Sequence, residues 1–411
     1  MTPTVRDEGR RLRVLVIDRS PPVDLTQGST LIAHHLFELL RQRHDLTLVC
    51  PASRELTASE LEALNARFER VHLVPRDEGV PAMGGWLEGR MARLPFPRIG
   101  SLDVPAARRL RGVVRACLAE GFDIVHARTV TMGALTMDLD HDARLLEMGD
   151  SISLGTKRAR ATGLRSALQR RAAGWIERST LPSFDAVTTV AQADGDQMQQ
   201  LAPEARIHVI PTGVDGTFFE SRSNGEVATK PPTLTFVGAM SYPPNVAAVR
   251  TFVHEALPRI RQHYPEVRFT VVGRDPHDQI RALGSTPGVE ITGYVPDVRP
   301  YLAESVVVVP MVSGSGIKNK VMEAFAMGRP VVATSLGVEG VAAEPGRDLL
   351  VADEPAAFAD AVVRLIADPN LAARLGAAGR HLVEERYTWE ACARRYDEVY
   401  RQLSAASRSA R

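Results

Sequence analysis

Short, strongly apolar runs rich in β-branched residues alternate along this sequence with longer segments of helical spacing. In the first half, the apolar runs fall at residues 13–17, 46–50, 71–74, 123–126, 186–190 and 207–210, and the helical patterns fall at residues 31–41, 106–120, 166–181 and 194–201. A run that is apolar at nearly every position is typical of a strand buried on both faces, and therefore of a parallel sheet covered by helices. The alternation predicts a doubly wound α/β unit.

The same alternation begins again in the second half of the chain. Its apolar runs fall at residues 234–237, 268–272, 289–292, 305–310, 330–334 and 349–351, and two of its helical patterns fall at residues 246–263 and 319–327. The segment between the halves, residues 213–232, is polar and rich in turn formers, which indicates a domain boundary. We therefore predict an α/β fold with two Rossmann-like, doubly wound parallel-sheet domains that face a central cleft, the usual place for a small-molecule site.

The predicted domains divide the chain unequally. The first spans residues 1–215, the second spans residues 216–387, and a C-terminal helix over residues 388–411 is expected to pack back toward the first domain. A length of 411 residues agrees with two domains of about 200 residues each, because a single core rarely grows that large. The near balance of 50 Lys and Arg against 49 Asp and Glu argues against a protein dedicated to nucleic acid.

The three cysteines, Cys50, Cys117 and Cys392, are far apart in the sequence. They form neither a disulfide framework nor a metal-binding spacing, so a reducing compartment is expected. No run approaches the roughly 18 apolar residues that a membrane span requires, and the polar N-terminus has no apolar leader core. We therefore expect a cytoplasmic protein, while the oligomeric state is not indicated.

The most informative stretch covers residues 305–334. A buried strand ends at Pro310, a Ser/Gly turn follows, and a helix then runs to Gly328, after which the next strand begins. Gly314 and Gly316 allow the backbone to approach a ligand closely. The unpaired N–H groups and the dipole at the start of the helix favour an anion.

Two lysines and a glutamate add to this pattern. Lys318 and Lys320 lie in the first turn of the helix, where each opposes the helix dipole by about 0.3–1 kcal/mol unless an anion is present. Glu323 follows about one turn after Lys320, so it can pair with that lysine or accept hydrogen bonds from a ribose. An ordinary strand–loop–helix with solvated lysines has the same spacing. The coincidence of glycine, lysine and carboxylate at the carboxyl end of a strand favours a diphosphate site.

This segment resembles a known family. Residues 314–334 are similar to the donor-binding segment of glycosyltransferase family 4, especially of bacterial sugar transferases with a Gly-rich turn and a Lys-x-x-Glu. The resemblance continues at residues 209–215, 236–245, 271–274, 293–296 and 387–389. It is close over residues 207–403 and loose over residues 12–206.

The resemblance implies a GT-B fold, with an acceptor-side first domain and a donor-side second domain. It further implies retaining, metal-independent transfer of a hexose-type sugar from a nucleotide-diphosphate sugar to a hydroxyl acceptor (a glycan, a lipid-linked molecule or a small natural product). No cofactor is implied beyond the nucleotide-sugar co-substrate. A nucleotide-sugar epimerase and a non-catalytic nucleotide-sugar-binding protein remain the alternatives. A dinucleotide oxidoreductase is disfavoured, because no G-x-G-x-x-G follows the first strand.

Carried over position by position, the resemblance assigns catalytic roles to His126, Lys320 and Glu323. It places a larger set of residues around the nucleotide sugar: Gly28, Gly238, Ala239, Arg274, Tyr294, Val295, Ser315, Gly316, Ile317, Lys318, Lys320 and Glu323. The sequence also departs from the family. Ser315 stands where a glutamate is common, and residues 240–248 contain neither the Arg nor the Lys that often follows the second-domain glycine.

Three assignments in the first domain have structural alternatives. His126 is expected to face the reacting sugar, or else to be a satisfied histidine at a strand end. Arg128 is a candidate for holding an anionic acceptor, or else a solvated or ion-paired arginine. Asp150 is a candidate acceptor contact just past a strand, or else a helix N-cap or turn residue.

Two further patterns bear on metal and membrane contacts. The pairs Asp138/Asp140 and Asp194/Asp196 have the spacing of metal-binding carboxylates, but neither ends a convincing buried strand, so no metal is expected. Residues 90–115 and 157–178 combine arginines with apolar side chains, as do segments that lie on anionic lipid. A helix on its own sheet with a solvated arginine face has the same pattern and is the favoured interpretation, and peripheral contact with the membrane inner face is the alternative.

Overall fold

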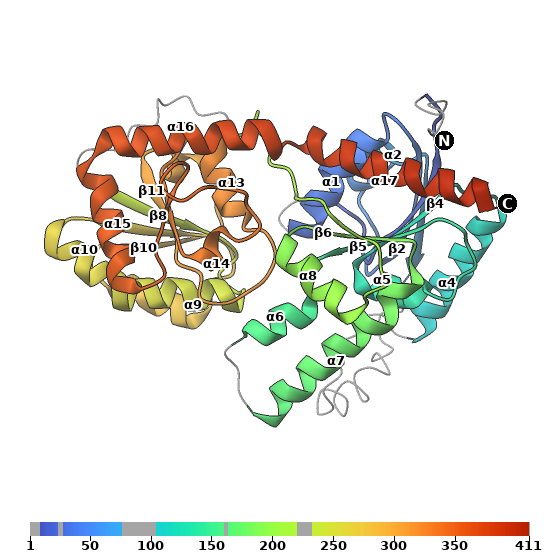
Figure 1. Ribbon diagram of the computed structural model, residues 1–411, viewed down its shortest axis with the longest axis horizontal. Helices are drawn as coiled ribbons and strands as arrows, with labels where there is room; N and C mark the ends of the chain where they lie inside the picture. Colours follow the sequence, from blue (N-terminus) through green and yellow to red (C-terminus); the bar gives the residue numbers. More distant parts are fainter. Residues whose placement is uncertain (1–8, 24–27, 76–103, 160–162, 220–231, 411) are drawn as a thin grey trace. The chain divides into compact units, whose positions relative to one another are not determined.

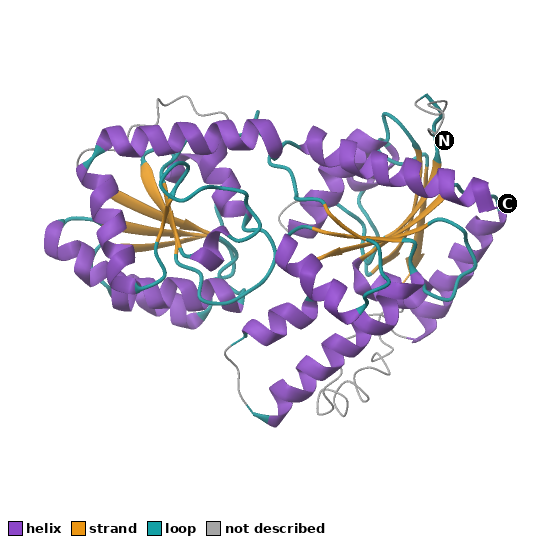
Figure 2. Cartoon of the chain, in the orientation of Figure 1, coloured by secondary structure: helices purple, strands orange, loops and turns teal. Residues whose placement is uncertain are grey.

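The computed structural model describes residues 9–23, 28–75, 104–159, 163–219 and 232–410, which divide into two compact units. Unit 1 comprises residues 1–211 and 389–411, and unit 2 comprises residues 212–388. Each unit is a parallel sheet flanked by helices (Figures 1 and 2). Most of the predicted linker (220–231) and much of the first basic stretch (90–103) lie outside the described residues.

Unit 1 contains a seven-stranded parallel sheet in the order β3-β2-β1-β4-β5-β6-β7. Its strands are β1 Arg13–Ile17, β2 Asp45–Ala52, β3 Arg70–Pro75, β4 Ile124–Arg128, β5 Arg144–Gly149, β6 Ala186–Thr189 and β7 Ile207–Val209. Its helices are α1 Gly28–Leu40, α2 Ala58–Asn65, α4 Val104–Ala119, α5 Thr129–Thr136, α6 Ile152–Arg158, α7 Leu164–Thr180, α8 Gln192–Leu201 and α17 Trp389–Ala410, with a 3₁₀ turn η1 at Leu181–Ser183.

Unit 2 contains a six-stranded parallel sheet in the order β10-β9-β8-β11-β12-β13. Its strands are β8 Thr233–Val237, β9 Arg268–Val272, β10 Val289–Gly293, β11 Ser305–Val309, β12 Val331–Ala333 and β13 Leu350–Val351. Its helices are α9 Pro243–Thr251, α10 Leu257–His263, α11 Asp278–Arg281, α12 Arg299–Leu302, α13 Asn319–Ala326, α14 Ser335–Val338, α15 Pro355–Ala367 and α16 Pro369–Arg386, with a π-helical turn η2 at Phe252–Ala256 and a 3₁₀ turn η3 at Ala282–Ser285.

In both sheets the first strand of the unit lies inside the sheet, and the order in which strands are added reverses beside it. The second and third strands extend to one side of β1, and β4 pairs on its other side; β8 and β11 have the same relationship in unit 2. At such a switch point the loops that leave the two strands diverge at their carboxyl ends, which opens a place for a ligand. The fold therefore directs attention to the β1/β4 edge and to the β8/β11 edge.

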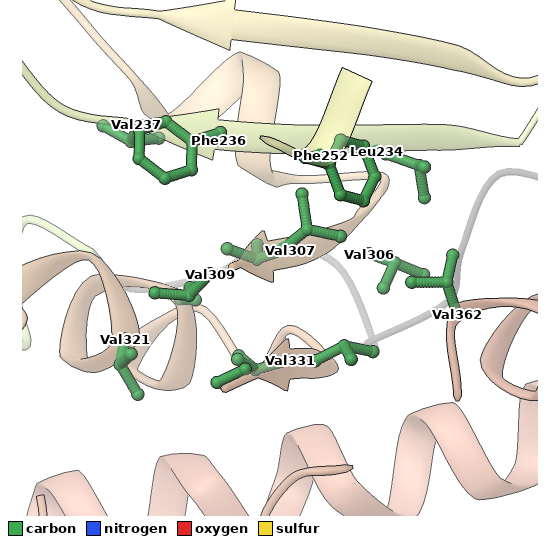
Figure 3. Close-up of a cluster of buried hydrophobic side chains, with 14 of the residues drawn as sticks. Leu234, Phe236, Val237, Phe252, Val306, Val307, Val309, Val321, Val331 and Val362 are labelled. Carbon is green, nitrogen blue, oxygen red and sulfur yellow. The ribbon is translucent and has the colours of Figure 1, made fainter. Parts of the chain in front are cut away.

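The core of unit 2 holds β11 in place. Its four valines are fully buried, and Figure 3 shows Val306, Val307 and Val309 among side chains from β8, β12 and α13. Each buried valine contributes roughly 1.5–3 kcal/mol relative to an exposed one. The end of β11, where the Gly-rich turn begins, is therefore a fixed point of the unit.

Helix α13 is anchored from its other side by α16. A Cβ on Gly379 would lie 2.4 Å from Cδ1 of Phe325, and a Cβ on Gly376 would lie 2.1 Å from the carbonyl oxygen of Gly328. These two glycines allow α16 to approach α13 more closely than any side chain would permit. The C-terminal end of α13 is thus held firmly against α16.

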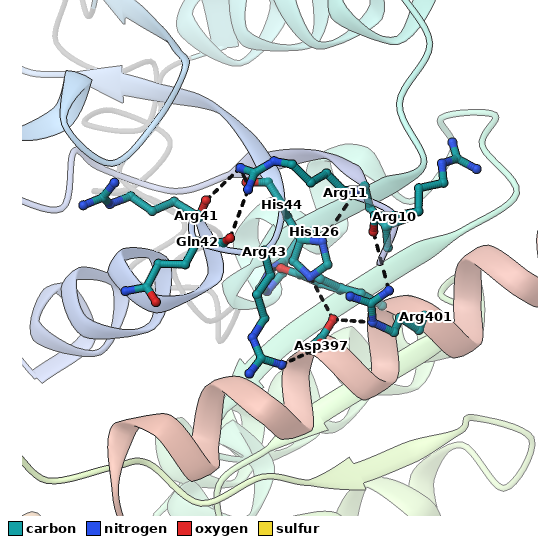
Figure 4. Close-up of polar contacts among 11 residues, drawn as sticks. Arg10, Arg11, Arg41, Gln42, Arg43, His44, His126, Asp397 and Arg401 are labelled. Carbon is teal, nitrogen blue, oxygen red and sulfur yellow. Dashed lines mark hydrogen bonds and ion pairs between the residues drawn. The ribbon is translucent and has the colours of Figure 1, made fainter. Parts of the chain in front are cut away.

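Helix α17 joins unit 1 through buried polar contacts as well as apolar ones. Asp397 accepts hydrogen bonds from Arg43 Nη1 at 2.8 Å, lies 3.0 Å from His44 Nε2 and pairs with Arg401 at 2.8 Å (Figure 4). Tyr400, on the same helix, is fully buried against the sheet. Because a buried carboxylate needs such partners, these contacts specify where the helix docks. Among the described helices, none combines the length and the apolar character needed to cross a membrane.

Candidate functional site

At the β8/β11 edge of unit 2, two loops are in direct backbone contact. Gly238 follows β8 and Gly273 follows β9, and the Gly238 N–H donates to Val272 O at 3.0 Å. A Cβ on Gly273 would lie 1.7 Å from the Gly238 carbonyl oxygen, so no side chain fits there. The two glycines therefore bring the backbone of both loops together beside the switch point.

Lys320, in the first turn of α13, reaches the turn that follows β8. Its ammonium donates to Asn245 Oδ1 at 3.0 Å and lies 4.7 Å from the centre of the Phe236 ring, a cation–π distance. Asn245 is buried, and its Nδ2 donates to the Ala239 carbonyl oxygen at 3.0 Å. A Cβ added to Gly238 would lie 3.4 Å from the ammonium. The structure thus brings Gly238, Ala239 and Lys320 together, and Asn245 connects them.

Lys318 stabilises the Gly-rich turn itself. This lysine is buried, and its ammonium donates to the carbonyl oxygens of Ser315 at 3.2 Å and Gly316 at 2.5 Å. Gly314 and Gly316 have φ of 109° and 70°, which only glycine adopts readily. The predicted contact of Lys318 with a diphosphate is therefore not the arrangement seen here, because the ammonium faces carbonyl groups of its own turn. Ile317 packs against the hydrophobic core of the unit.

The two charged groups of α13 shift each other's titration. Burial lowers the pKa of Lys320 to about 8, with a smaller contribution from the neighbouring Lys318 and against the opposing effect of Glu323. Burial raises the pKa of Glu323, against the effect of Lys320. Since burial disfavours the charged form of each group, a bound anion would be expected to favour the charged form of Lys320.

The remaining donor-site candidates follow β9 and β10. The carbonyl oxygen of Arg274 accepts from Met240 N at 2.9 Å, which ties its loop to the turn after Ala239. Tyr294 follows β10 and is exposed, whereas Val295 packs partly against the core. These side chains lie at the carboxyl ends of the two strands on one side of β8, while Lys320 follows β11 on its other side. They therefore occupy the same edge of the sheet as the lysine.

In unit 1, His126 lies in the interior. Its side chain is completely buried, with Nδ1 2.7 Å from the Tyr400 hydroxyl and Nε2 3.2 Å from Glu147 Oε2. The rings of Phe37, Tyr396 and Tyr400 surround it. The structure therefore places His126 away from solvent, with Nδ1 paired to the Tyr400 hydroxyl and Nε2 beside the Glu147 carboxylate, rather than facing a reacting sugar.

Arg128 is a buried ion-paired arginine. It donates to both oxygens of Glu147 at 2.9 and 2.7 Å, pairs with Asp18, and donates to Ser29 O at 3.2 Å. Burial alone would lower its pKa, but the two carboxylates raise it well above the usual value. Conversely, Arg128 holds the pKa of buried Glu147 well below the usual range. The expected role in holding an anionic acceptor disagrees with this geometry, because two carboxylates already neutralise the guanidinium.

Asp18 and Glu147 were not singled out from the sequence. Asp18 directly follows β1, and Glu147 lies within β5, so together with Arg128 they join β1, β4 and β5 at the switch point of unit 1. For Asp18, an acidic residue directly after a buried strand was the available signal; Glu147, inside a strand, has no such signal. The consequence is a buried ion-paired cluster at the edge where ligands bind in such sheets.

The other unit 1 candidates lie on neighbouring loops. Asp150 is exposed after β5, but the N-cap of α6 is Ser151, whose Oγ accepts from Leu154 N at 3.2 Å. Gly28 is the first residue of α1. Within the described ranges, no group of three or more His, Cys, Asp and Glu side chains is arranged to hold a metal ion.

Two known protein families match this chain, one over most of unit 1 and the other within unit 2. Residues 27–218 match the family model "Glycosyltransferase Family 4", and residues 231–368 match the model "Glycosyl transferases group 1". Two Rossmann-like domains with these matches define a glycosyltransferase of the GT-B type. The chain belongs to glycosyltransferase family 4, and it is an enzyme that transfers a sugar.

Its relatives include two curated mycobacterial enzymes. The alpha-maltose-1-phosphate synthase of Mycolicibacterium smegmatis is 29% identical over 56% of this chain, and the aligned part covers 66% of that relative. The phosphatidyl-myo-inositol mannosyltransferase of Mycobacterium leprae is 25% identical over 87% of this chain and 97% of its own length. Among solved structures, HepE of Anabaena in complex with UDP and glucose has a TM-score of 0.67 at 15% identity, covering 95% of this chain and all of the other.

Proposed function

We propose that this glycosyltransferase moves a hexose-type sugar from a nucleotide-diphosphate sugar to a hydroxyl acceptor, with retention of anomeric configuration and without a metal ion. One observation carries the proposal. The Lys320 ammonium, with its pKa lowered to about 8, lies against the Gly238–Ala239 turn at the switch point of unit 2. A cation beside glycine backbone at this edge suits a diphosphate.

Within this proposal, each group at the edge has a role. Negative charge grows on the diphosphate as its bond to the sugar breaks, and Lys320 would stabilise that charge. Glu323, about one helical turn further along α13, would accept hydrogen bonds from the ribose hydroxyls. Arg274 and the Tyr294–Val295 turn would border the base. The departing phosphate would help to deprotonate the acceptor, so that no strong protein base is needed.

The acceptor is proposed by its chemical class alone. The names of the relatives, a phosphatidyl-myo-inositol mannosyltransferase and an alpha-maltose-1-phosphate synthase, support transfer of a hexose. We propose a glycan, a lipid-linked molecule or a small natural product as the acceptor, and no nucleic acid as a partner. We also propose a cytoplasmic location, because Cys50, Cys117 and Cys392 are buried free thiols, as is usual in a reducing compartment.

A nucleotide-sugar panel tests the proposal. UDP-, GDP-, ADP- and dTDP-sugars would be compared by thermal shift and calorimetry in the presence of a chelator, because a ligand that binds only the folded protein stabilises it. We expect one base to bind and Lys320→Ala to lose that binding. Slow hydrolysis or transfer, with the product anomer read by NMR, identifies the enzyme. Release of an epimerised nucleotide sugar, or binding without any turnover, would support one of the alternatives instead.

A further inference from the structure

Helices α6 and α7 form a pair that extends from the sheet of unit 1. They are in contact with each other, and the end where α6 stops at Arg158 and α7 starts at Leu164 points away from the sheet (Figure 1). Helix α7 packs on α5 and α8 through one face, which carries its buried residues: Ala172, Ala173, Ile176, Glu177 and Thr180. The opposite face is not covered by the described part of unit 1.

That outward face carries a stripe of large apolar side chains and arginines. Leu164, Leu168, Arg171, Trp175 and Arg178 follow one another at spacings of four, three, four and three residues, which places them on one side of a helix. Leu164 is 77% exposed and Trp175 is 59% exposed. A solvated arginine face, the interpretation favoured from the sequence, does not account for two such exposed apolar side chains. We call these five residues the α7 stripe.

The surroundings of the α7 stripe are strongly basic. The described residues 151–159 and 163–180 contain six basic side chains, Lys157, Arg158, Arg165, Arg170, Arg171 and Arg178, and a single acidic one. That acid, Glu177, is completely buried on the inner face. The whole chain has a net charge of only +1, so the helix pair concentrates positive charge beside exposed apolar surface.

We propose that the α7 stripe is a docking surface for an anionic lipid bilayer. Trp and Leu side chains along one helix enter the boundary between headgroups and acyl chains, while flanking arginines bind anionic headgroups. The distance between Leu164 and Trp175 corresponds to about 16 Å of helix, so both would lie in the membrane plane together. Arginines within the α7 stripe disfavour pairing with a second copy, since Arg171 and Arg178 bring like charge into such a contact.

The helix pair is connected firmly to the carboxyl edge of the unit 1 sheet. Glu177 on α7 accepts from Ser151 Oγ at 3.1 Å and from Ser153 N at 3.2 Å, at the start of α6. Ser151 N in turn donates to buried Asp194 on α8 at 2.8 Å. A bilayer bound by α7 would therefore be held at a fixed position relative to the loop that follows β5.

Vesicle binding by the full-length protein, without any sugar nucleotide, tests the proposal independently of enzyme activity. Cosedimentation would compare vesicles of phosphatidylcholine with vesicles of phosphatidylcholine and phosphatidylglycerol. We expect binding to the anionic vesicles only, reduced by salt. Arg171→Glu with Arg178→Glu should weaken partitioning at least twentyfold, since each charge at the surface changes it about fivefold. Arg259→Glu with Arg374→Glu, both exposed in unit 2, changes the net charge equally and should preserve binding.

Tryptophan emission provides the second readout. In a protein whose third tryptophan is removed by Trp86→Phe, binding should shift the emission to the blue, and Trp175→Phe should lose that shift, whereas Trp389 is buried and serves as an internal background. The proposal is overturned if the wild type ignores anionic vesicles, or if both double variants lose binding equally. It is also overturned if the protein does not bind lipid but forms a dimer, or binds nucleic acid, and Trp175→Ala abolishes that binding. The α7 stripe would then belong to that other partner.

Discussion

The Lys320 ammonium donates to Asn245 Oδ1 at 3.0 Å, and this contact connects the helix after β11 with the turn after β8. Asn245 completes the connection by donating from Nδ2 to the Ala239 carbonyl oxygen. Residues 240–248 lack the Arg and Lys that are common there in the family. In their place, the neutral amide of Asn245 orients Lys320 and adds no further positive charge. The following predictions rest largely on this edge of unit 2.

Changing Asn245 should alter nucleotide binding without unfolding unit 2. Asn245→Ala removes the acceptor that orients Lys320, and we expect the affinity for the matching nucleoside diphosphate to fall about fivefold to tenfold, as for the loss of one hydrogen bond. Asn245→Asp should weaken it further, because the new carboxylate competes with the diphosphate for the ammonium. Calorimetry measures both variants. Equal affinity of wild type and Asn245→Asp would contradict a diphosphate at this lysine.

Removing either charged residue of α13 should weaken donor binding. Lys320→Ala and Glu323→Ala each delete a charge-assisted contact worth about 1.5–3 kcal/mol, which corresponds to a roughly tenfold to 150-fold loss of affinity. Arg374→Ala, exposed on α16, is the matched control and should bind like the wild type. Circular dichroism verifies that the fold is retained. Unchanged binding of every nucleotide diphosphate by both variants would refute the site.

Nucleotide affinity should depend on pH through Lys320. Burial lowers the pKa of this lysine to about 8, and a diphosphate raises it again, so binding takes up a proton above that pH. Affinity should be level below about pH 8 and fall by up to about tenfold per pH unit above it. Calorimetry in buffers of different ionisation enthalpy counts the protons. Lys320→Met should show neither the proton uptake nor the fall.

In the absence of ligand, the same shift acts on stability in the opposite direction. The pKa of Lys320 in the folded protein lies below its ordinary value of 10.5, so the unfolded chain binds the extra proton between about pH 8 and that value. The free energy of unfolding should therefore gain a contribution as the pH rises through this window. Denaturant unfolding of wild type and Lys320→Met across the window isolates it. A wild-type curve parallel to that of the variant would count against the shift.

Gly273→Ala should damage the donor edge. The new Cβ would lie 1.7 Å from the Gly238 carbonyl oxygen, so one of the two loops must move. We expect both a lower unfolding temperature and loss of nucleotide binding. Gly112→Ala is the control, because a Cβ there meets nothing within 4 Å in helix α4 and should be neutral or stabilise by roughly 0.5–1 kcal/mol. Normal nucleotide binding by Gly273→Ala would contradict the assignment of this edge.

Tyr400→Phe should destabilise unit 1 and leave nucleotide binding unchanged. The variant keeps the aromatic ring but removes the hydroxyl from His126 Nδ1, and an unsatisfied buried polar atom costs about 1–3 kcal/mol. Denaturant unfolding gives the stability, and calorimetry gives the nucleotide affinity as the internal control. Wild-type stability of the variant would mean that the buried contact contributes nothing to docking of the helix.

The fold could be predicted because each buried strand has a recognisable pattern within a few residues of sequence. Four of the five residues of β11 are fully buried valines, and such an unbroken apolar run is typical of a strand buried on both faces. The Gly-rich turn and Lys320 were located for a similar reason, since their signal lies within a few residues of sequence.

The environment of the unit 1 candidates could not be predicted. His126 meets Tyr400, which lies 274 residues later, and Arg128 meets Asp18, which lies 110 residues earlier. No local pattern reports such pairings, so a histidine at a strand end has the same sequence signature whether it faces a substrate or a tyrosine. Lys318 is a similar case, because its contact with the carbonyl groups of its own turn depends on the exact path of the backbone.

Helix α17 makes unit 1 a discontinuous domain, since its segments 1–211 and 389–411 are separated by the whole of unit 2. During synthesis, the ribosome must complete unit 2 before the nascent first domain receives the helix that covers Phe37, His44 and His126. Until then the side chains that α17 covers lack their partners, and we expect this surface to be exposed on the nascent chain. Unit 2 has no such dependence, so it is expected to mature first although it is translated second.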